Sequence, residues 1–241
     1  MSAVVIGAKG SIGGACIRQL ALAFQDVFAL DLSDSGIPGT RSVTVDVTDP
    51  TSVAKALDEV EAVSPIEALI YAAGLNTTGY VEGIAWDDYE RVMDVNLRGS
   101  FVVGAAMQTR IRNRPRACAF VFISSTAGLV GEAGGSVYCA SKFGLRGFAQ
   151  SFAAEIAQWQ CRANTVCPGN VDSPMLSLLV DQIAERSGRT GQQVLEELAA
   201  STSLNRLISI DEVAKTCAWL VSPDSSGISG QTIVVDGPPP A

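Results

Sequence analysis

The chain has 241 residues, of which 47% are hydrophobic and 17% charged, and these proportions exclude a disordered chain. Its formal net charge of −8 argues against a nucleic-acid partner, because phosphates favour a basic surface. No uncharged apolar run approaches the roughly 18 residues that a membrane helix requires. Histidine is absent, which removes imidazole general bases, histidine metal ligands and every Ser-His or Cys-His catalytic device.

The six cysteines are scattered and form no CxxC pair, so we expect no metal site and interpret them as small buried apolar residues. The N-terminus runs from Met1 directly into an apolar stretch, without the basic lead of a secretory signal. We therefore expect a cytoplasmic protein, in a compartment that keeps thiols reduced.

Short β-rich runs alternate with longer helical patterns along most of the chain. Strands are expected at Ala3–Ile6, Val27–Leu30, Ser42–Val45, Ile66–Tyr71, Cys118–Ile123, Ala163–Cys167 and Thr232–Val235. Helices are expected at Ile12–Phe24, Pro50–Val63, Trp86–Arg112, Val137–Gln158 and Ile210–Val221. The strand runs are continuously apolar, as in buried parallel strands. The pattern predicts an α/β fold, a single-domain Rossmann-like doubly wound parallel sheet of about seven strands with helices on both faces.

The segment Asp172–Ser203 interrupts this alternation. It contains two short helical patterns, Pro174–Glu185 and Gln192–Ala200, divided by the polar stretch Ser187–Gly191. We interpret it as a substrate lid over one end of the sheet, because such a segment closes over reactants and excludes water. Residues 1–241 then form one dinucleotide-binding and catalytic domain.

Residues 7–13, which follow the first strand, form a glycine-rich turn into the first helix. Glycines at this position allow a diphosphate to approach the backbone and the free N–H groups of the helix. We expect Gly7, Gly10, Ser11, Ile12 and Gly13 to bind a dinucleotide, although an ordinary turn also uses glycine.

Asp31 ends the second strand, about 20 residues after the glycine turn, where a carboxylate can accept hydrogen bonds from the adenosine ribose. It would repel a 2′-phosphate, so the sequence favours NAD, and NADP is less favoured. The alternative is a solvated aspartate at a strand end, and Lys9 and Arg41 are possible cationic neighbours.

Two further strand ends carry candidate cofactor contacts. Asp46 and Val47 follow the third strand, where a carboxylate could lie beside an adenine amino group, but a turn or capping role is also open. Ala72 and Gly74 follow the fourth strand, where small residues let a cofactor lie against the backbone or let helices pack closely.

A set of polar residues points to catalysis. Tyr138 and Lys142 are four residues apart in a helical segment, so both side chains lie on one face of the helix. Ser125 ends the fifth strand, and Asn96 lies inside the preceding helical pattern, an unfavourable place for asparagine on propensity alone.

This set resembles the short-chain dehydrogenase/reductase family, in its compact single-domain form, over essentially the whole chain. The resemblance rests on the Tyr138–Lys142 pair with its preceding serine and on three further motifs. These motifs are Asn96-Leu97-x-Gly99-x-Phe101, Pro168-Gly169-x-Val171-x-Ser173-Pro174-Met175 and Gly230-Gln231-Thr232-Ile233-Val234-Val235-Asp236-Gly237.

The resemblance implies a role for each catalytic residue. Tyr138 would be the acid/base at the substrate oxygen, and Ser125 would hydrogen-bond the carbonyl or alcohol. Lys142 would hold the nicotinamide ribose and lower the pKa of Tyr138, and Asn96 would hold a water in a proton relay from Lys142. A cation about 4 Å away at an effective dielectric near 20 contributes about 4 kcal/mol. That energy corresponds to a pKa change of about three units.

The resemblance also places four residues around the nicotinamide. Pro168 and Gly169 would shape its pocket, and the Val171 backbone would meet the carboxamide. Ser173 stands where threonine is usual and would contact the carboxamide or phosphates, or cap the helix that opens at Pro174.

The chain departs from the family pattern at three places. Ile6 replaces a threonine, Ser11 replaces the middle glycine of the turn, and Tyr71 begins a segment that is usually Asn-Asn-Ala-Gly. The stretch between Asp31 and Ser42 is too short for the usual helix.

The resemblance implies an NAD-dependent oxidoreductase that interconverts a secondary alcohol and a ketone by hydride transfer. Substrate contacts in the family come from the segments after Ser125 and Pro168, which are mostly apolar here, so we expect a largely apolar small molecule. These residues are Ala127, Leu129, Val130, Asn170, Met175, Leu176, Leu179 and Val180. The alternatives are a dehydrogenase of ring diols (cis- or trans-dihydrodiols), a 3-oxoacyl thioester reductase and a catalytically idle nucleotide-sensing protein. The family commonly assembles through its two long central helices, so we also expect a homotetramer or homodimer.

Overall fold

The computed structural model describes residues 2–202 and 204–236, and within them the strands form one seven-stranded parallel sheet in the order β3-β2-β1-β4-β5-β6-β7. The strands are β1 (Ser2–Ile6), β2 (Asp26–Asp31), β3 (Arg41–Thr44), β4 (Ile66–Tyr71), β5 (Ala119–Ile123), β6 (Arg162–Pro168) and β7 (Thr232–Val235). Every strand bound lies within one residue of its predicted position. Ser203, the last residue of the predicted lid, and Gly237, the last of the predicted motifs, lie outside the described residues.

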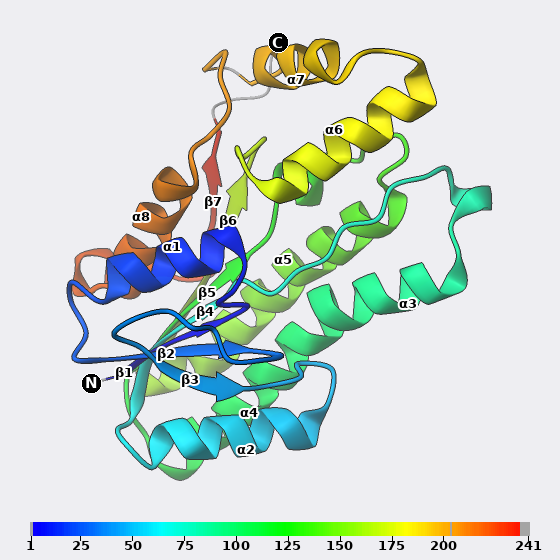
Figure 1. The fold of residues 1–241 in the computed structure, drawn as a ribbon. Coiled ribbons are helices and arrows are strands. Elements are labelled where there is room, and N and C mark those ends of the chain that lie inside the picture. The colour runs from blue at the N-terminus through cyan, green and yellow to red at the C-terminus, as the bar shows by residue number, and fades with distance from the viewer. Residues whose placement is uncertain (1, 203, 237–241) are drawn as a thin grey trace.

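Helices cover both faces of the sheet, as the continuously apolar strands predict (Figure 1). Along β1, Val4 and Ile6 belong to one apolar cluster, whereas Ala3 and Val5 belong to the other. The first cluster is covered by α2 (Pro50–Glu61), α4 (Gly99–Asn113) and α5 (Ser136–Ile156). The second is covered by α1 (Ser11–Leu20) and α8 (Ile210–Val221). Short 3-10 turns lie at Val81–Gly83, Thr126–Gly128, Ala157–Trp159 and Pro223–Ser225.

The long helix predicted over 86–112 is wrong in its continuity. The structure divides it into α3 (Trp86–Met93), a π-helical turn at Asp94–Arg98, and α4. The π turn contains Asn96, which is fully buried and bonded to other segments. A π turn shifts the register of a helix at a single point and is frequent at functional sites, which a periodicity argument does not detect.

The first helix ends four residues earlier than predicted, at Leu20. After it, the backbone makes tighter hydrogen bonds, from the Leu22 N–H to Gln19 and from the Ala23 N–H to Leu20. These bonds turn the chain, so Leu22 is exposed while Phe24 packs back against the core.

The predicted lid forms α6 (Pro174–Ser187) and α7 (Gly191–Ala200), which lie beyond the carboxyl ends of the strands (Figure 1). Gly188 ends α6 in the left-handed conformation, with a φ of 69°, and Thr190 begins α7 with a capping box. Leu176, Val180 and Val194 form a small apolar cluster of the lid's own.

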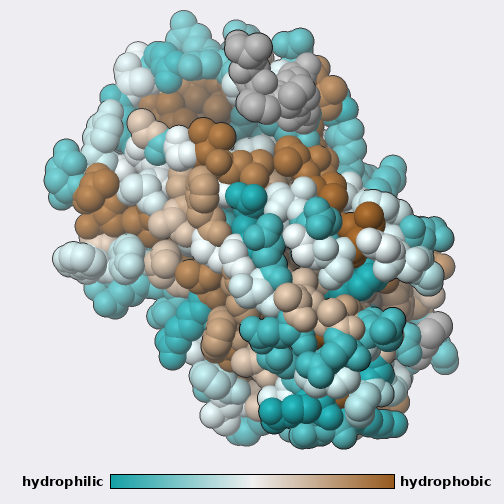
Figure 2. Space-filling model, turned by 180° about the vertical axis from the view of Figure 1, so that it is seen from behind, coloured by the Kyte–Doolittle hydropathy of each residue, from teal (hydrophilic) through white to brown (hydrophobic). Residues whose placement is uncertain are grey.

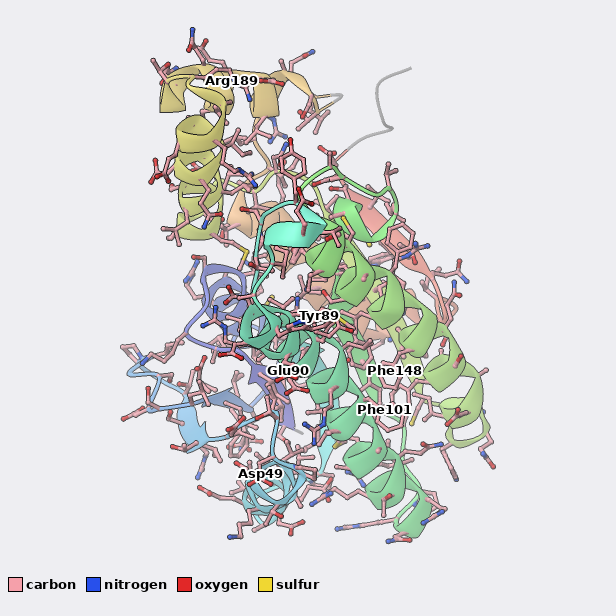
Figure 3. The ribbon with its side chains drawn as sticks, turned by 90° about the vertical axis from the view of Figure 1, so that its right-hand side faces the viewer. Asp49, Tyr89, Glu90, Phe101, Phe148 and Arg189 are labelled. Carbon is pink, nitrogen blue, oxygen red and sulfur yellow. The ribbon has the colours of Figure 1, made fainter. Side chains whose placement is uncertain are left out.

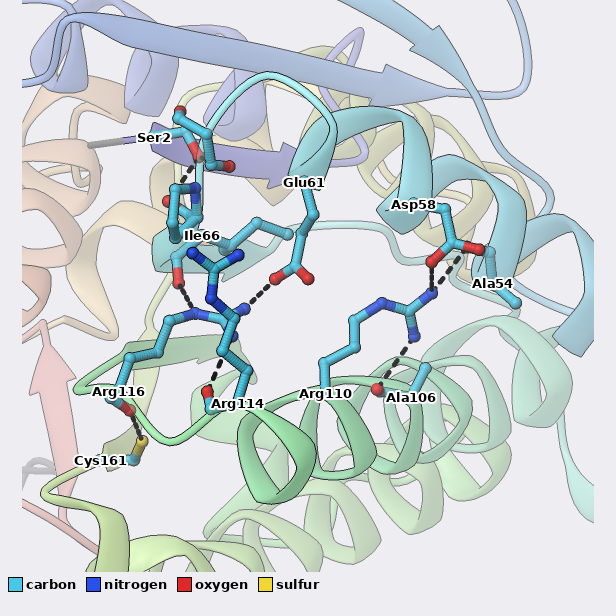
Figure 4. Close-up of polar contacts among 12 residues, drawn as sticks. Ser2, Ala54, Asp58, Glu61, Ile66, Ala106, Arg110, Arg114, Arg116 and Cys161 are labelled. Carbon is cyan, nitrogen blue, oxygen red and sulfur yellow. Dashed lines mark hydrogen bonds and ion pairs between the residues drawn. The ribbon is translucent and has the colours of Figure 1, made fainter.

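Charged side chains tie the opposite end of the sheet together (Figure 4). Arg110 of α4 pairs with Asp58 of α2, and Arg116 pairs with Glu61 and donates to the Ile66 carbonyl at 3.2 Å. These contacts fix the amino ends of the strands, away from the edge that holds the predicted site.

No helix in the described part of the chain is long and apolar enough to cross a membrane. Seen from behind, apolar side chains reach the surface in separate patches over the upper part of the molecule, while its lower end is mostly hydrophilic (Figure 2).

Candidate active site

The glycine turn between β1 and α1 has the shape that a diphosphate site requires. Gly7 has a φ of 82°, and a Cβ there would overlap the backbone of Ala73. A Cβ on Gly13 would overlap the Gly7 carbonyl. Gly10 is the N-cap of α1 and provides no side-chain hydrogen bond, so the first N–H groups of the helix are left for another partner.

A groove with a volume of about 580 Å³ opens beside this turn. Its lining residues are Ala8, Lys9, Gly10, Ser11, Gly14, Arg18, Ser35, Ile37 and Pro38. It brings the glycine turn and the short loop after β2 to one opening, so the two parts predicted to hold the cofactor face a common space.

Asp31 lies against the glycine turn. Its carboxylate accepts hydrogen bonds from the backbone N–H groups of Lys9 and Leu32, both at 2.8 Å. The Lys9 ammonium donates to Ser33 at 2.8 Å. Asp31 is therefore held beside the predicted dinucleotide site, and the Lys9 ammonium of the glycine turn is bonded to Ser33, two residues after Asp31.

The other candidate cofactor residues take structural roles in the protein. The Asp46 carboxylate accepts from the backbone and side chain of Thr48, which is the turn alternative, and Val47 is buried. Ser173 caps α6 by accepting from the Leu176 N–H at 3.3 Å. The Val171 backbone pairs with Ile208, beside the lid.

Gly169 and Gly74 lie so close to other side chains that a Cβ at either position would crowd them. A Cβ on Gly169 would overlap the carboxyl group of Asp236, which follows β7. A Cβ on Gly74 would lie 3.3 Å from Nζ of Lys142 and 3.5 Å from Oδ1 of Asn96. Gly74 therefore makes room for two of the predicted catalytic side chains, a role that the sequence did not reveal. Ala72, two residues before Gly74, donates its backbone N–H to the Ile6 carbonyl at 2.8 Å. Pro168 is the last residue of β6 and precedes Gly169.

Tyr138 and Lys142 lie together on the first turns of α5, as their spacing predicts. The Lys142 ammonium lies 5.6 Å from the centroid of the Tyr138 ring and donates to the Ile123 carbonyl at 2.9 Å. Burial lowers the pKa of Lys142 to about 8. Because the side chain is buried, its charge is kept close to the phenol and away from solvent.

Burial raises the pKa of Tyr138 to about 12, and hydrogen bonding to Ser125 acts in the opposite direction. The pKa of Tyr138 is therefore raised in the protein itself, not lowered as the resemblance implied. The physical reason is that the phenol has lost more hydration than its neighbours restore. Ser125 also accepts from the Ala127 N–H at 3.2 Å, which fixes the serine at the end of β5.

Asn96 links three parts of the site. Its amide accepts from the Leu75 N–H at 2.8 Å and donates to the Leu75 carbonyl at 2.9 Å. It also donates to Oγ of Ser141, the neighbour of Lys142, at 3.0 Å. Asn96 thus holds the loop after β4 against α5, and its water-holding role stays a prediction.

Several residues expected to touch substrate make contacts within or to the predicted lid. Leu176 and Val180 face the lid's own apolar cluster, and Asn170 donates to the Leu198 carbonyl at 3.0 Å. Val130 and Met175 are exposed.

All six cysteines are buried and unpaired, which confirms their interpretation as small core residues. In the described residues, no cluster of three or more His, Cys, Asp or Glu side chains could hold a metal ion.

Comparisons with known proteins identify the family of the chain. A family model described as "Enoyl-(Acyl carrier protein) reductase" matches residues 7–237. The 3-oxoacyl-[acyl-carrier-protein] reductase MabA of Mycobacterium tuberculosis is 34% identical, over 98% of this chain and 91% of the relative. The short-chain reductase protein NovJ of Streptomyces niveus is 30% identical, over 98% of this chain and 92% of the relative.

Among solved structures, sorbitol-6-phosphate 2-dehydrogenase SrlD from Erwinia amylovora superposes with a TM-score of 0.91. The two sequences are 26% identical, and the match covers 98% of each chain.

Proposed function

Because the chain belongs to the short-chain dehydrogenase/reductase family of oxidoreductases, we propose that it is an NAD-dependent enzyme that interconverts a secondary alcohol and a ketone. The observation that carries the proposal is the placement of Lys142 beside Tyr138, with Ser125 hydrogen-bonded to the phenol. Members of the family bind a nicotinamide cofactor, and the glycine turn, the groove beside it and Asp31 fit the adenosine and diphosphate parts of that molecule.

Tyr138 exchanges the proton of the substrate oxygen. With its pKa raised to about 12, the phenol is protonated near neutral pH and is ready to donate to a ketone. Oxidation of an alcohol needs the phenolate, which nearby positive charge favours, and the Lys142 ammonium lies 5.6 Å from the centroid of the Tyr138 ring. A bound nicotinamide supplies the two-electron exchange with the substrate carbon.

Ser125 positions the substrate oxygen, because its hydroxyl lies next to the Tyr138 phenol and donates or accepts as the oxygen changes state. Asn96 and Gly74 position Lys142. Asn96 holds Ser141, and Gly74 leaves space for the ammonium.

The preference for NAD rests on Asp31, whose carboxylate would accept from both ribose hydroxyls and repel a 2′-phosphate. Initial rates with NAD and NADP under identical conditions test it. A strong preference for NADP would refute this part of the proposal.

The favoured substrate is a largely apolar secondary alcohol, because the segments after Ser125 and Pro168 are mostly apolar. The similarity to MabA supports a 3-oxoacyl thioester reductase as a second candidate. A screen with secondary alcohols, ring diols and hydroxyacyl thioesters separates these substrates from the idle nucleotide-sensing protein, which would turn over none of them.

We also propose assembly into a homotetramer or homodimer through α4 and α5. Phe101 of α4 and Phe148 of α5 lie side by side, with ring centroids 5.6 Å apart, and Phe101 is 59% exposed (Figure 3). Phe143 is also exposed on α5. Light scattering would show a multiple of the 25.1 kDa chain, and a clean monomer would contradict it.

A cytoplasmic location completes the proposal, and its support is the six free thiols.

A further inference from the structure

Tyr71 is the last residue of β4, at a place where the chain departs from the family pattern. Its side chain is fully buried, and its ring lies in the apolar core near Phe122, with ring centroids 6.2 Å apart. Burial raises the pKa of Tyr71, so the phenol keeps its proton far above neutral pH. Its hydroxyl is therefore a permanent hydrogen-bond donor that requires an acceptor inside the protein.

The acceptor lies in the π-helical turn that contains Asn96. The Tyr71 hydroxyl donates to the Val95 carbonyl at 2.6 Å. In a π turn the backbone bonds skip to the fifth residue, as in the bond from the Gly99 N–H to the Asp94 carbonyl. A side chain that enters the hydrogen-bond ladder of a helix changes the path of the helix at that point. The Tyr71 hydroxyl thus reaches the helix where its register changes.

Gly99 leaves the space that this hydroxyl occupies. A Cβ on Gly99 would overlap Oη of Tyr71 and would lie 3.0 Å from Cγ2 of Val47. Gly99 follows the π turn directly and begins α4. The motif that runs from Asn96 to Gly99 therefore meets β4 and its following loop at both of its ends.

Two more hydrogen bonds join the same two segments. The Asn96 side chain accepts from the Leu75 N–H at 2.8 Å and donates to the Leu75 carbonyl at 2.9 Å, four residues after Tyr71. It also donates to Oγ of Ser141, the neighbour of Lys142, at 3.0 Å. The Tyr71 bond fixes the backbone from which Asn96 projects, and Asn96 in turn contacts the helix that carries Lys142.

We propose that Tyr71 is a positioning residue of the active site, whose hydroxyl holds the π turn in the register that places Asn96 against Ser141. This inference rests on the proposed function and adds to it a residue outside the catalytic set. Because the hydroxyl bonds to the turn, its effect on turnover passes through Asn96. Tyr71→Phe keeps the ring in the apolar core but removes the donor to the Val95 carbonyl.

Tyr71→Phe should lower kcat by about 10-fold and leave KM and NADH affinity unchanged, because small misplacements of catalytic groups have large effects on rate. Rates are measured with the member of the secondary alcohol, ring diol and hydroxyacyl thioester panel that wild type converts fastest. Ile66→Val is the matched control, since Ile66 is fully buried at the opposite end of β4. This control should lower the unfolding temperature by about 2–4 °C without changing kcat.

Double-mutant cycles separate positioning from general destabilisation. If Tyr71 acts through Asn96, Tyr71→Phe should change kcat by less than about 2-fold in the Asn96→Ala background. Losses that multiply would overturn the inference. In a second cycle, the Cβ of Gly99→Ala would overlap the hydroxyl, so this change should lower kcat more in wild type than in the Tyr71→Phe background. Equal losses in the two backgrounds would also overturn it.

Hydrogen exchange at the Leu75 amide reports the position of Asn96 without any substrate, because this N–H donates to Oδ1 of Asn96. Tyr71→Phe should speed the exchange by at least about 10-fold, and Ile66→Val should leave it unchanged. A chain that binds no NADH or NADPH and converts no panel substrate refutes the proposed function, and the exchange rate then still decides the inference. Unchanged exchange, or a Tyr71→Phe enzyme with the wild-type kcat, refutes the inference alone.

Discussion

The ammonium of Lys142 lies 5.6 Å from the ring centroid of Tyr138 and donates to the Ile123 carbonyl at 2.9 Å. The ammonium therefore lies near the phenol, at the end of β5. Desolvation lowers the pKa of Lys142 to about 8. The arrangement favours activity at a cost in stability, which gives the first prediction.

Lys142→Met should lower kcat by about 100-fold or more, because proton exchange by Tyr138 loses its neighbouring charge. The same change should raise the unfolding temperature by about 2–4 °C, because removing a desolvated charge should increase the free energy of unfolding by about 1 kcal/mol. The unfolded state binds the lysine proton more tightly, so the stability difference should be largest below pH 8 and shrink towards pH 10.5. Calorimetry and initial rates measure both effects, with exposed Lys55→Met as the control. A variant both inactive and less stable would contradict the account.

The pH dependence of ketone reduction should reflect two groups. Tyr138, with its pKa at about 12, keeps its proton up to pH 10, whereas Lys142 loses its own as pH rises through about 8. Reduction should therefore fall above pH 8, where the charge beside Tyr138 is lost. Rate profiles from pH 6 to 10 test this, and the step near pH 8 should vanish in Lys142→Met. Reduction that accelerates through pH 8 would count against these assignments.

Gly74→Ala should lower kcat by about 10-fold while the protein stays folded. The new Cβ would lie 3.3 Å from Nζ of Lys142, so the ammonium must move by a few tenths of an ångström, whereas the 3.5 Å to Oδ1 of Asn96 is an ordinary contact. Small misplacements of catalytic groups cost large factors in rate. The control is Gly147→Ala in α5, where a Cβ meets nothing within 4 Å and should stabilise the helix by about 0.5–1 kcal/mol. Normal turnover by Gly74→Ala would show that the close contact has no catalytic consequence.

Asp31→Ser should move the cofactor preference from NAD towards NADP by at least about 10-fold in the ratio of their kcat/KM values. The substitution removes the repulsion of a 2′-phosphate and leaves the nearby Lys9 ammonium free to attract it. Asp34→Ser, in the same loop, is the control. An unchanged ratio would remove Asp31 from cofactor selection.

Much of the fold is predictable because buried parallel strands have continuous apolar sequences. For this reason each observed strand end lies within one residue of the predicted one. The π turn at Asn96 is not predictable in this way, because it depends on hydrogen bonds to Leu75 and Ser141, far away in the chain. The Tyr138–Lys142 pair follows from helical spacing alone.

The rest of the site depends on burial, which the sequence does not display. The Tyr138 phenol has a raised pKa because it is desolvated, although the resemblance to the family implied a lowered one.

The most direct test of the central assignment compares wild type with Tyr138→Phe, following NADH formation across the alcohol panel and NADH binding by fluorescence. The phenyl ring keeps the shape of the site but has no exchangeable proton. We predict a loss of at least about 1,000-fold in kcat with NADH affinity unchanged, and no effect from Tyr89→Phe. A Tyr138→Phe enzyme that oxidises alcohols at the wild-type rate would contradict the assignment of Tyr138 as the acid/base.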